Sequence, residues 1–456
     1  GSFLTTRKTR TQSGVAPMAV MTMPFACPGR CIFCPLEKGM PKSYLSDEPA
    51  AQRAKKVNFD PKLQIKSRLK QLAATGHTTD KIEIIVIGGT FSAYPKEYKI
   101  KFFQSIFEAL NGKKSKSLEE AQFVNETAKH RAVGISIETR PDWVTKDEIK
   151  LLRRLGVTKL QLGVQALDEK ILKKIKRGHS LEPVATSTRL LKNSGFKICY
   201  HFMPNLPGST PKKDISMAAM MFEDKRFKPD YLKIYPVQVI PTTELHTLFK
   251  AGKFKTYTDK SLKNVLKSIK EITPPWVRID RLVRDISRQW VSSGTLKTNI
   301  RQIIQQELKE EGKTCQCIRC REIKDGLHSQ SPKLKEIIID TLGAKEHFLS
   351  FEDKGNLYSL LRLRLPDKDQ QVLFPELEGA AIIREVHTFG SALALKERQS
   401  AEAQHKGLGK KLVSKAEKIS KEKGFKKLAV ISAVGTKKYY SKLGFKKDGL
   451  YMTKDI

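Results

Sequence analysis

Between residues 18 and 282, short apolar runs alternate with longer stretches in which apolar residues recur every three or four positions. The short runs have the character of buried strands, and the longer stretches have the period of amphipathic helices. Candidate strands lie at 18–23, 82–89, 133–138, 158–164, 197–203 and 231–237. This repetition predicts an α/β fold with a parallel sheet. Because six units are fewer than the eight of a closed barrel, we predict an incomplete TIM-like (β/α) barrel, with a doubly wound sheet as the alternative.

The pattern changes after residue 282. Residues 283–330 are rich in Arg and Lys and lose the alternation, so they are predicted to be a connector. A second α/β region then begins, with candidate strands and helices at 335–340, 357–365, 379–390, 426–433 and 437–445. The predicted organisation is a basic segment at 1–17, a partial barrel at 18–282, a connector at 283–330 and a second α/β domain at 331–456.

The net charge of +37 comes from 85 Lys and Arg residues against 48 Asp and Glu residues. Such an excess predicts a polyanionic partner, with nucleic acid ahead of an anionic membrane because no basic amphipathic helix with an aromatic face stands out. A merely basic soluble surface is the alternative. The sequence has no membrane-length apolar run and no signal peptide, which predicts a cytoplasmic protein without a membrane partner. Gly1-Ser2, with no initiator Met, resembles the scar of tag cleavage, which predicts a truncated N-terminus.

Three of the seven cysteines, Cys27, Cys31 and Cys34, follow the first predicted strand within eight positions. Their number and clustering fit metal ligation in a reducing compartment better than a disulfide scaffold. Three thiolates suit three corners of a 4Fe–4S cluster and leave one iron open to a small molecule. The alternative is a zinc site completed by a distant histidine.

Polar residues and glycines follow the later strands at the same predicted mouth. Gly88 and Gly89 end the second strand, where glycine lets backbone groups approach a ligand. Glu138 ends the third strand, and Gln161 and Gln165 are weaker candidates on the fourth. A plain turn is the alternative for the glycine pair, and a salt bridge with Arg140 is the alternative for Glu138.

The connector holds a second cysteine triplet. Cys315, Cys317 and Cys320 have the spacing of zinc ligands, and thiolates favour zinc or iron. We predict a structural zinc whose fourth ligand comes from elsewhere, with a second iron–sulfur cluster as the alternative. His328 is the nearest histidine but is not assigned as that ligand.

A glycine motif opens a helix in the second domain. Gln404, Gly407 and Gly409 form a Gln-x-x-Gly-x-Gly pattern, and Leu408 and Lys410 lie within the same turn. Backbone N–H groups bared by glycine at a helix N-terminus suit a pyrophosphate.

These motifs resemble two known families. The first cysteine triplet resembles that of the radical S-adenosylmethionine (SAM) superfamily, which implies that Gly88, Gly89, Glu138 and Gln165 contact SAM. Residues from about 335 to 456 resemble a GNAT-type acetyltransferase, which implies acetyl-CoA binding. The residues implied for acetyl-CoA are Glu385, Val386, His387, Thr388, Gln404, Gly407, Leu408, Gly409, Lys410 and Tyr440. Tyr440 is favoured over Tyr439 as the residue near the thioester sulfur, because adjacent helical residues point in different directions and only one need reach the ligand.

The expected catalytic residues are therefore Cys27, Cys31, Cys34, His387 and Tyr440. For His387 and the tyrosines, the alternative is an ordinary position in the protein core.

Taken together, "MAVMTMPFACPGRC", "GGTFSAYP", "GISIETRPDW", "RGHS", "REVHTFGS" and "AVISAVGTKKYYSKLGF" make nearly the whole chain resemble the catalytic-subunit family of Elongator. The resemblance implies an enzyme that forms 5-carboxymethyluridine at the wobble uridine of tRNA from acetyl-CoA. It implies that a deoxyadenosyl radical takes hydrogen from the acetyl methyl group, that the carbon radical adds to C5, and that hydrolysis releases CoA. It also implies acetyl-CoA binding by Lys81, and other Elongator-type subunits or a second copy as partners. A protein lysine acetyltransferase with a structural iron–sulfur domain, and a non-catalytic tRNA-binding scaffold, are the alternatives.

Overall fold

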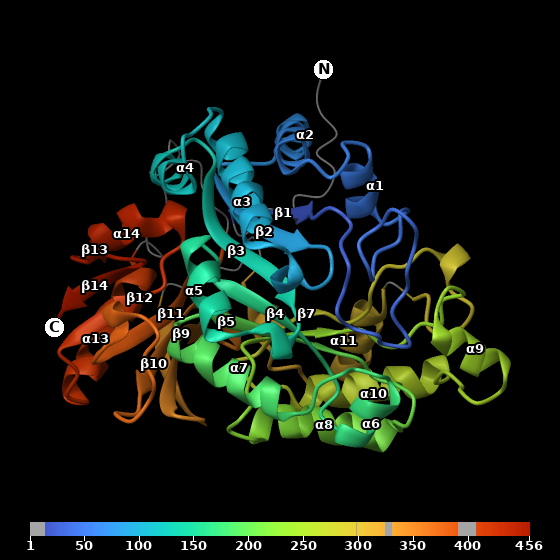
Figure 1. Ribbon diagram of the computed structural model, residues 1–456. Coiled ribbons are helices and arrows are strands. Elements are labelled where there is room, and N and C mark those ends of the chain that lie inside the picture. Colours follow the sequence, from blue (N-terminus) through green and yellow to red (C-terminus); the bar gives the residue numbers. More distant parts are fainter. Residues whose placement is uncertain (1–13, 298, 324–330, 391–406) are drawn as a thin grey trace.

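The computed structural model describes residues 14–297, 299–323, 331–390 and 407–456. Two seven-stranded sheets lie side by side, as Figure 1 shows, with the first running from blue to yellow and the second in orange and red. Between them, in sequence, lies a short segment that carries the second cysteine triplet.

The first sheet is parallel throughout and its strands follow one another in chain order. They are β1 (Ala16–Met21), β2 (Lys81–Ile87), β3 (Arg131–Thr139), β4 (Lys159–Gln165), β5 (Lys197–Phe202), β6 (Tyr231–Ile234) and β7 (Arg278–Arg281). An unbroken sequential order has no point where the strand order reverses, so the sheet is an open half-barrel. The predicted incomplete barrel is confirmed, and the doubly wound alternative is wrong. The sequence missed β7 because its four residues include no apolar run.

Helices cover the outer face of this sheet (Figure 1). They are α1 (Pro49–Lys55), α2 (Pro61–Ala74), α3 (Lys96–Asn111), α4 (Leu118–Asn125), α5 (Lys146–Arg154), α6 (Glu169–Lys174), α7 (Glu182–Asn193), α8 (Pro211–Glu223), α9 (Glu244–Lys250) and α10 (Asp259–Ile272), with short 3-10 turns η2 (Phe91–Ala93) and η3 (Pro141–Trp143). Helix α5 illustrates how the sequence starts a helix. The Thr145 hydroxyl accepts a hydrogen bond from the backbone N–H of Glu148 at 3.1 Å, which satisfies a donor left free at the helix start.

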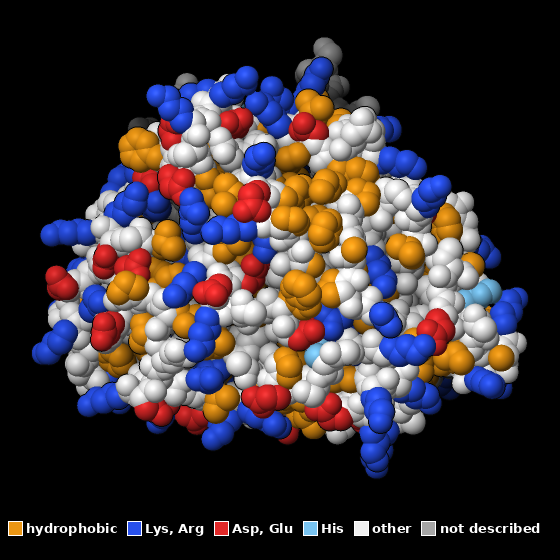
Figure 2. Space-filling view, in the orientation of Figure 1, with side chains coloured by type: hydrophobic (Ala, Val, Ile, Leu, Met, Phe, Trp, Pro, Cys, Tyr) orange, Lys and Arg blue, Asp and Glu red, His pale blue; other side chains and the backbone are white. Residues whose placement is uncertain are grey.

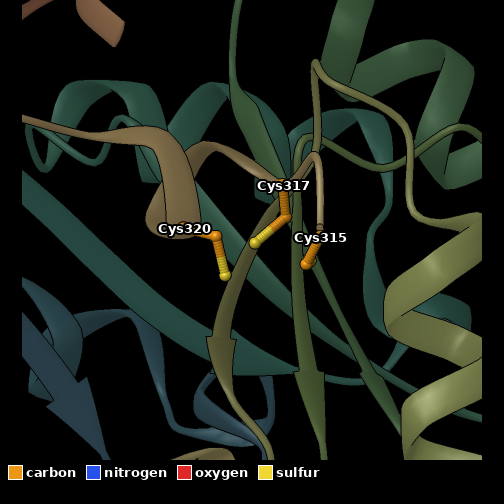
Figure 3. A group of neighbouring side chains, drawn as sticks. All are labelled: Cys315, Cys317 and Cys320. Carbon is orange, nitrogen blue, oxygen red and sulfur yellow. The ribbon is translucent and has the colours of Figure 1, made fainter. Parts of the chain in front are cut away.

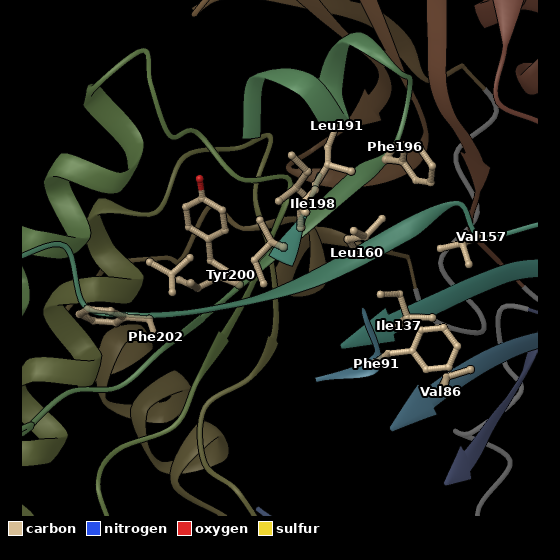
Figure 4. Close-up of a cluster of buried hydrophobic side chains, with 14 of the residues drawn as sticks. Val86, Phe91, Ile137, Val157, Leu160, Leu191, Phe196, Ile198, Tyr200 and Phe202 are labelled. Carbon is tan, nitrogen blue, oxygen red and sulfur yellow. The ribbon is translucent and has the colours of Figure 1, made fainter. Parts of the chain in front are cut away.

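The core of the half-barrel lies between the sheet and these helices (Figure 4). Val86 and Ile137 come from β2 and β3, and Leu160 and Ile198 come from β4 and β5. All four are at most 1% exposed. Burial of this layer fixes which face of each strand points outward, so the alternate residues of the same strands face the inside of the half-barrel.

The second sheet is mixed, in the order β13-β14-β12-β11-β10-β9-β8. Its strands are β8 (Lys333–Thr341), β9 (Ala344–Asp353), β10 (Asn356–Pro366), β11 (Ala380–Thr388), β12 (Lys427–Val430), β13 (Lys446–Asp448) and β14 (Tyr451–Asp455). Helix α13 (Leu408–Glu422) packs against β10 and β11, and the 3-10 turn η7 (Val434–Thr436) leads into α14 (Lys437–Ser441). The sequence missed β9, β13 and β14, of which β9 follows β8 after a tight turn at Gly343, where φ is +76°.

The segment between the sheets includes the 3-10 turn η4 (Arg288–Trp290) and helices α11 (Ile300–Glu310) and α12 (Ile318–Arg321). Backbone bonds tie its end to both sheets, since the Ile318 N–H donates to the Val277 carbonyl and the Ile323 N–H donates to the Leu357 carbonyl. It therefore joins the two sheets side by side rather than separating them.

Buried ion pairs connect the two sheets directly. Arg384 on β11 contacts Asp230, just before β6, at 2.5 Å, and Glu346 on β9 at 3.1 Å. Arg364 on β10 also reaches Glu346, at 2.8 Å. Burial by itself would raise the pKa of Asp230, but Arg384 and Arg362 hold it below its ordinary value. A network of buried, charged side chains thus lies at the contact between the two sheets.

A search of the described residues for a membrane-spanning helix finds none that is both long enough and apolar enough.

Candidate active site

The first cysteine triplet lies on the loop that follows β1, at the carboxyl ends of the parallel strands. Cys27, Cys31 and Cys34 are all partly exposed. The Cys27 sulfur lies 3.5 Å from the Thr90 hydroxyl and accepts from the Gly29 N–H at 3.4 Å. The turn after β2 therefore lies directly against the cysteine loop.

The triplet suits a group larger than a single ion. Among the described residues, only Cys315, Cys317 and Cys320 bring three ligand atoms within 4.8 Å of one another, so the sulfurs of the first triplet are spread more widely. Burial raises the pKa of the Cys34 thiol to about 12, and metal binding is what deprotonates such a thiol. A partly exposed set of three widely spread thiols fits three corners of a 4Fe–4S cluster.

Gly88 and Gly89 adopt left-handed backbone conformations, with φ of +136° and +92°. A Cβ on Gly88 would lie 1.9 Å from the Thr22 hydroxyl oxygen, and one on Gly89 would lie 3.2 Å from the Lys42 carbonyl oxygen. Only glycine fits this turn against the end of β1 and the cysteine loop.

A polar cavity opens beside the triplet. Its lining joins the three cysteines to Gly89, Glu138, Gln161 and Gln165 from the ends of β2, β3 and β4. Glu138 accepts a hydrogen bond from the Tyr44 hydroxyl at 2.6 Å and lies 3.9 Å from the Lys233 ammonium. The alternative partner for Glu138 is wrong, because Arg140 is held by Asp142 at 2.8 and 3.0 Å.

The two glutamines differ in what they bind. Gln161 accepts from Lys233 and from the His201 ring at 3.2 Å. Burial and then Lys233 lower the pKa of His201, so the ring is neutral and its Nε2–H donates. Gln165 has an unusual φ of +71°, and its buried side-chain oxygen has no partner among the described residues. Its side chain is therefore the one left available to a ligand.

Several residues of this cavity or its rim were not predicted from the sequence, among them Tyr44, Arg177, His201 and Lys233. Arg177 donates to the Cys31 sulfur at 3.4 Å and to the Gly163 carbonyl. A signal was present for two of them, since polar residues alternate with apolar ones along β5 and β6. An alternating pattern in a strand covered by helices indicates a polar interior.

The polar interior continues toward the opposite end of the half-barrel. Lys159 pairs with Glu83 at 2.7 Å and lies over the Tyr231 ring at 4.8 Å. Lys159 lowers the pKa of Glu83 to about 2, so the pair is charged. The Tyr231 hydroxyl in turn donates to Glu385 of β11. A run of polar side chains therefore leads from the half-barrel to the second sheet.

The second candidate region gathers where β11 ends and α13 begins. A Cβ placed on Gly409 would lie 2.8 Å from the Tyr439 hydroxyl and 3.7 Å from side-chain atoms of Val386 and Thr388. Gly407 caps α13 with φ of +110°, and Leu408 and Lys410 lie in the first turn. Gln404 lies outside the described residues.

The two faces of β11 point to different surroundings. Glu385 bonds to Arg362 at 2.8 Å and faces the half-barrel. His387 is half-buried beside Phe389, and its Nε2 atom is buried without a partner among the described residues. Val386 and Thr388 face Gly409.

The two adjacent tyrosines, Tyr439 and Tyr440, lie in different surroundings. Tyr440 is buried at 7% exposure among apolar residues of the second domain, which include Leu412 and Phe445. Tyr439 is 41% exposed, and its hydroxyl faces Gly409.

Lys81 begins β2 and is exposed, at the end opposite Gly88. Its neighbour in register on β3 is Arg131, whose Cβ lies 2.6 Å from where a Cβ on Gly435 would be. The turn before the tyrosine helix thus packs against the end of the half-barrel at which Lys81 lies.

The second cysteine triplet converges on one point (Figure 3). The described residues supply no fourth ligand there, and His328 lies outside them. Cys320 accepts hydrogen bonds from buried Lys270 and from Gln305, both at 3.3 Å. N–H donors of this kind stabilise a thiolate bound to a metal.

Lys and Arg side chains are spread over the whole face seen in Figure 2 rather than confined to one patch. This distribution fits the net charge of +37 and a broad contact with a polyanion.

Comparison with known families matches the two regions separately. The profile of the radical SAM superfamily matches residues 21–220, and that of the radical SAM C-terminal domain matches residues 229–310. The profile of the acetyltransferase (GNAT) family matches residues 332–445. The half-barrel with its cysteine loop and the second sheet with its glycine turn define a radical SAM protein fused to a GNAT domain.

The chain is similar over its whole length to individual proteins of this class. It is 43% identical to a tRNA uridine(34) acetyltransferase of Dehalococcoides mccartyi, over 98% of this chain and 99% of that protein. It is 38% identical to human Elongator complex protein 3, over 98% of this chain and 85% of that protein. The chain is also similar to the solved structure of archaeal Elp3 from Methanocaldococcus infernus with an N-terminal deletion. The two superpose with a TM-score of 0.85 at 40% sequence identity, over 97% of this chain and 100% of that one. The chain belongs to the family of tRNA uridine(34) acetyltransferases and Elongator complex protein 3, as the sequence motifs predicted.

Proposed function

We propose that this protein is a tRNA-modifying enzyme that forms 5-carboxymethyluridine at the wobble uridine, with SAM as radical source and acetyl-CoA as carbon donor. The names of its relatives supply the tRNA uridine. The observation that carries the proposal is the set of polar side chains inside the half-barrel, Glu83, Lys159 and Tyr231, that leads to Glu385 of β11. A reaction that uses both cofactors together needs a connection between their two sites. Two domains that catalyse independent reactions need no such connection.

In the proposed site, Cys27, Cys31 and Cys34 hold a 4Fe–4S cluster. Gly88, Gly89, Glu138 and Gln165 line the place for SAM beside it. When bound, this pair supplies the one-electron chemistry that removes a hydrogen atom from an unactivated C–H bond. The protein's own contribution is to orient the ligand, since Tyr44 fixes the Glu138 carboxylate and Gly89 keeps the cavity open.

The second region is proposed to bind acetyl-CoA. Gly407, Leu408, Gly409 and Lys410 offer backbone N–H groups at the start of α13, which suit a pyrophosphate. The strand from Glu385 to Thr388 lies beside this turn. Lys81, His387 and Gln404 remain proposed contacts from the family resemblance.

The direct test is product formation. The protein is reconstituted anaerobically with iron and sulfide, then given reductant, SAM, acetyl-CoA and a tRNA with a wobble uridine, and the tRNA is digested to nucleosides. Carboxymethylated uridine is the expected product. Its absence, with the cluster intact and tRNA bound, would refute the proposal. Acetylation of a lysine peptide without SAM would favour the alternative, a protein lysine acetyltransferase.

The tyrosine near the thioester is open to a separate test. The sequence favours Tyr440, whereas the position of the hydroxyls favours Tyr439. We expect Tyr439→Phe to lower the rate of product formation by about 10²-fold, as loss of one oriented donor does. Tyr440→Phe keeps a ring in the core and is expected to change the rate by less than about threefold on the same principle. The reverse order of effects would assign the role to Tyr440.

A zinc ion at Cys315, Cys317 and Cys320 is proposed as a structural fastening between the sheets. Because all three thiols converge on one site, Cys317→Ser is expected to remove about one equivalent of zinc, measured by elemental analysis, and to lower the melting temperature. Cys31→Ser is the matched control and should retain the zinc. Iron in place of zinc would support the second iron–sulfur cluster instead.

We further propose a cytoplasmic location, with other Elongator-type subunits or a second copy as partners. The names of the eukaryotic relatives support a complex. The exposed edge strand β8 offers Leu334 and Ile338, which are 40% and 58% exposed, as one surface for it.

A further inference from the structure

A larger cavity, of about 710 Å³, adjoins the cysteine pocket. Three segments enclose it: residues 28–30 of the cysteine loop, residues 140–143 after β3, and residues 169–180 around α6. The two cavities share only Gly29, Arg140 and Arg177. It is therefore a neighbouring compartment, separated from the cysteine pocket by two arginine side chains.

Positive charge dominates the lining. Five cations face two carboxylates: Arg30, Arg140, Lys173, Lys176 and Arg177 against Asp142 and Glu169. Arg140 is held by Asp142, and Lys176 by Glu244. Arg30 and Lys173 are exposed and form no ion pair with the described residues, so they are available to an anion such as a phosphate.

The cavity also offers an aromatic face. Trp143 ends the turn η3 and is 37% exposed, with no aromatic ring beside it among the described residues. An exposed indole next to cations is the arrangement on which nucleic-acid bases stack.

Buried polar atoms without partners lie in the same wall. Nδ1 of His179 lies 2.8 Å from the Ser180 carbonyl and must donate to it, so Nε2 of the neutral ring is an acceptor. That Nε2 atom, and the Arg140 Nη1 donor, have no partner among the described residues. Unpaired buried polar groups are rare and indicate a group that the protein does not supply. An acceptor beside cationic donors matches the 2′-hydroxyl and phosphate of a ribonucleotide.

We propose that this cavity binds one nucleotide of the RNA substrate, next to the nucleotide whose base enters the cysteine pocket. Its base stacks on Trp143, its phosphate meets Arg30 and Lys173, and its 2′-hydroxyl donates to His179. This inference rests on the proposed function, since it assumes an RNA substrate. It assigns the placement of the RNA chain to the side chains that line this cavity, above all Arg30, Trp143 and Lys173.

The first test compares matched pairs of variants of the full chain for tRNA affinity, by fluorescence anisotropy at fixed salt. Trp143→Ala and Lys173→Glu alter the cavity. The control variants Phe123→Ala and Lys170→Glu make comparable changes outside the cavity. Phe123 is 68% exposed on α4, and Lys170 lies on the same helix as Lys173. The cavity variants are expected to weaken binding about tenfold or more, and the controls less than about twofold. Equal effects in cavity and control variants, at unchanged melting temperatures, would overturn the proposal.

The second test locates the contact on the RNA. A tRNA with 5-bromouridine on either side of the target is expected to cross-link to the peptide containing Trp143 on irradiation. A 2′-deoxy sugar at the cross-linking position should weaken binding to the unmodified protein by about three- to tenfold and leave binding to His179→Ala unchanged. An absence of the Trp143 cross-link at both positions, or equal deoxy effects in both proteins, would overturn the assignment. If the proposed function is wrong, the result is different: no carboxymethyluridine forms, although the variants show these same effects on tRNA affinity.

Discussion

Replacing Cys31 with serine is expected to abolish formation of carboxymethyluridine and to remove the brown colour and the iron of the anaerobically reconstituted protein. Serine is a poor ligand for iron, so the substitution removes one of the three proposed cluster ligands. Iron analysis and nucleoside analysis of the same preparation measure both effects. Affinity for tRNA should change by less than about twofold, because phosphate contacts supply most of that binding.

Cys199→Ser is the matched control. Cys199 is fully buried on β5, outside the cysteine loop, and its replacement should leave the iron content unchanged. Full product formation by Cys31→Ser would exclude a cluster at this loop and, with it, the radical function.

Replacing Arg384 with alanine is expected to lower the free energy of unfolding by about 3 kcal/mol or more. Arg384 is fully buried and contacts Asp230 of the half-barrel and Glu346 of the second sheet. Its removal leaves both carboxylates buried with less compensation, and such uncompensated charge costs more than the ion pair itself contributes. Chemical denaturation followed by circular dichroism measures the change.

Arg154→Ala provides the comparison at the surface. Arg154 pairs with Glu119 at 2.8 Å, but both side chains are about half exposed, at 44% and 55%. Its loss should cost no more than about 1 kcal/mol. Equal effects of the two substitutions would show that the charged contact between the sheets contributes nothing beyond a surface ion pair.

The sequence predicted the parts of the fold that depend on local pattern. The strands of the half-barrel have buried apolar positions that the periodicity reveals, and six of the seven appear in the predicted order. Strand β7 was missed because RIDR has almost no apolar content, and its pairing with β6 depends on the sheet already present.

The candidate site likewise has residues that the sequence predicted and residues that it did not. The cysteine loop, Gly88, Gly89 and Glu138 follow directly from motif and strand position. Tyr44 and Arg177 could not be found in this way, because their positions depend on how loops fold back over the strand ends. The local sequence pattern also could not identify the partner of Glu138, because Arg140, two residues away, pairs with Asp142 instead.

The contacts made by the C-terminal strand have a consequence for synthesis of the protein on the ribosome. Arg153 on α5 donates to the Leu450 carbonyl, 297 positions away, and the Tyr451 hydroxyl donates to the Ser194 carbonyl, 257 positions away. Contacts of such long range cannot form until both partners have been translated. The half-barrel, although it emerges first, therefore keeps part of its buried surface uncovered until residues 450 and 451 leave the exit tunnel. A chain truncated before residue 450 would lack these contacts and would leave that part of the half-barrel uncovered.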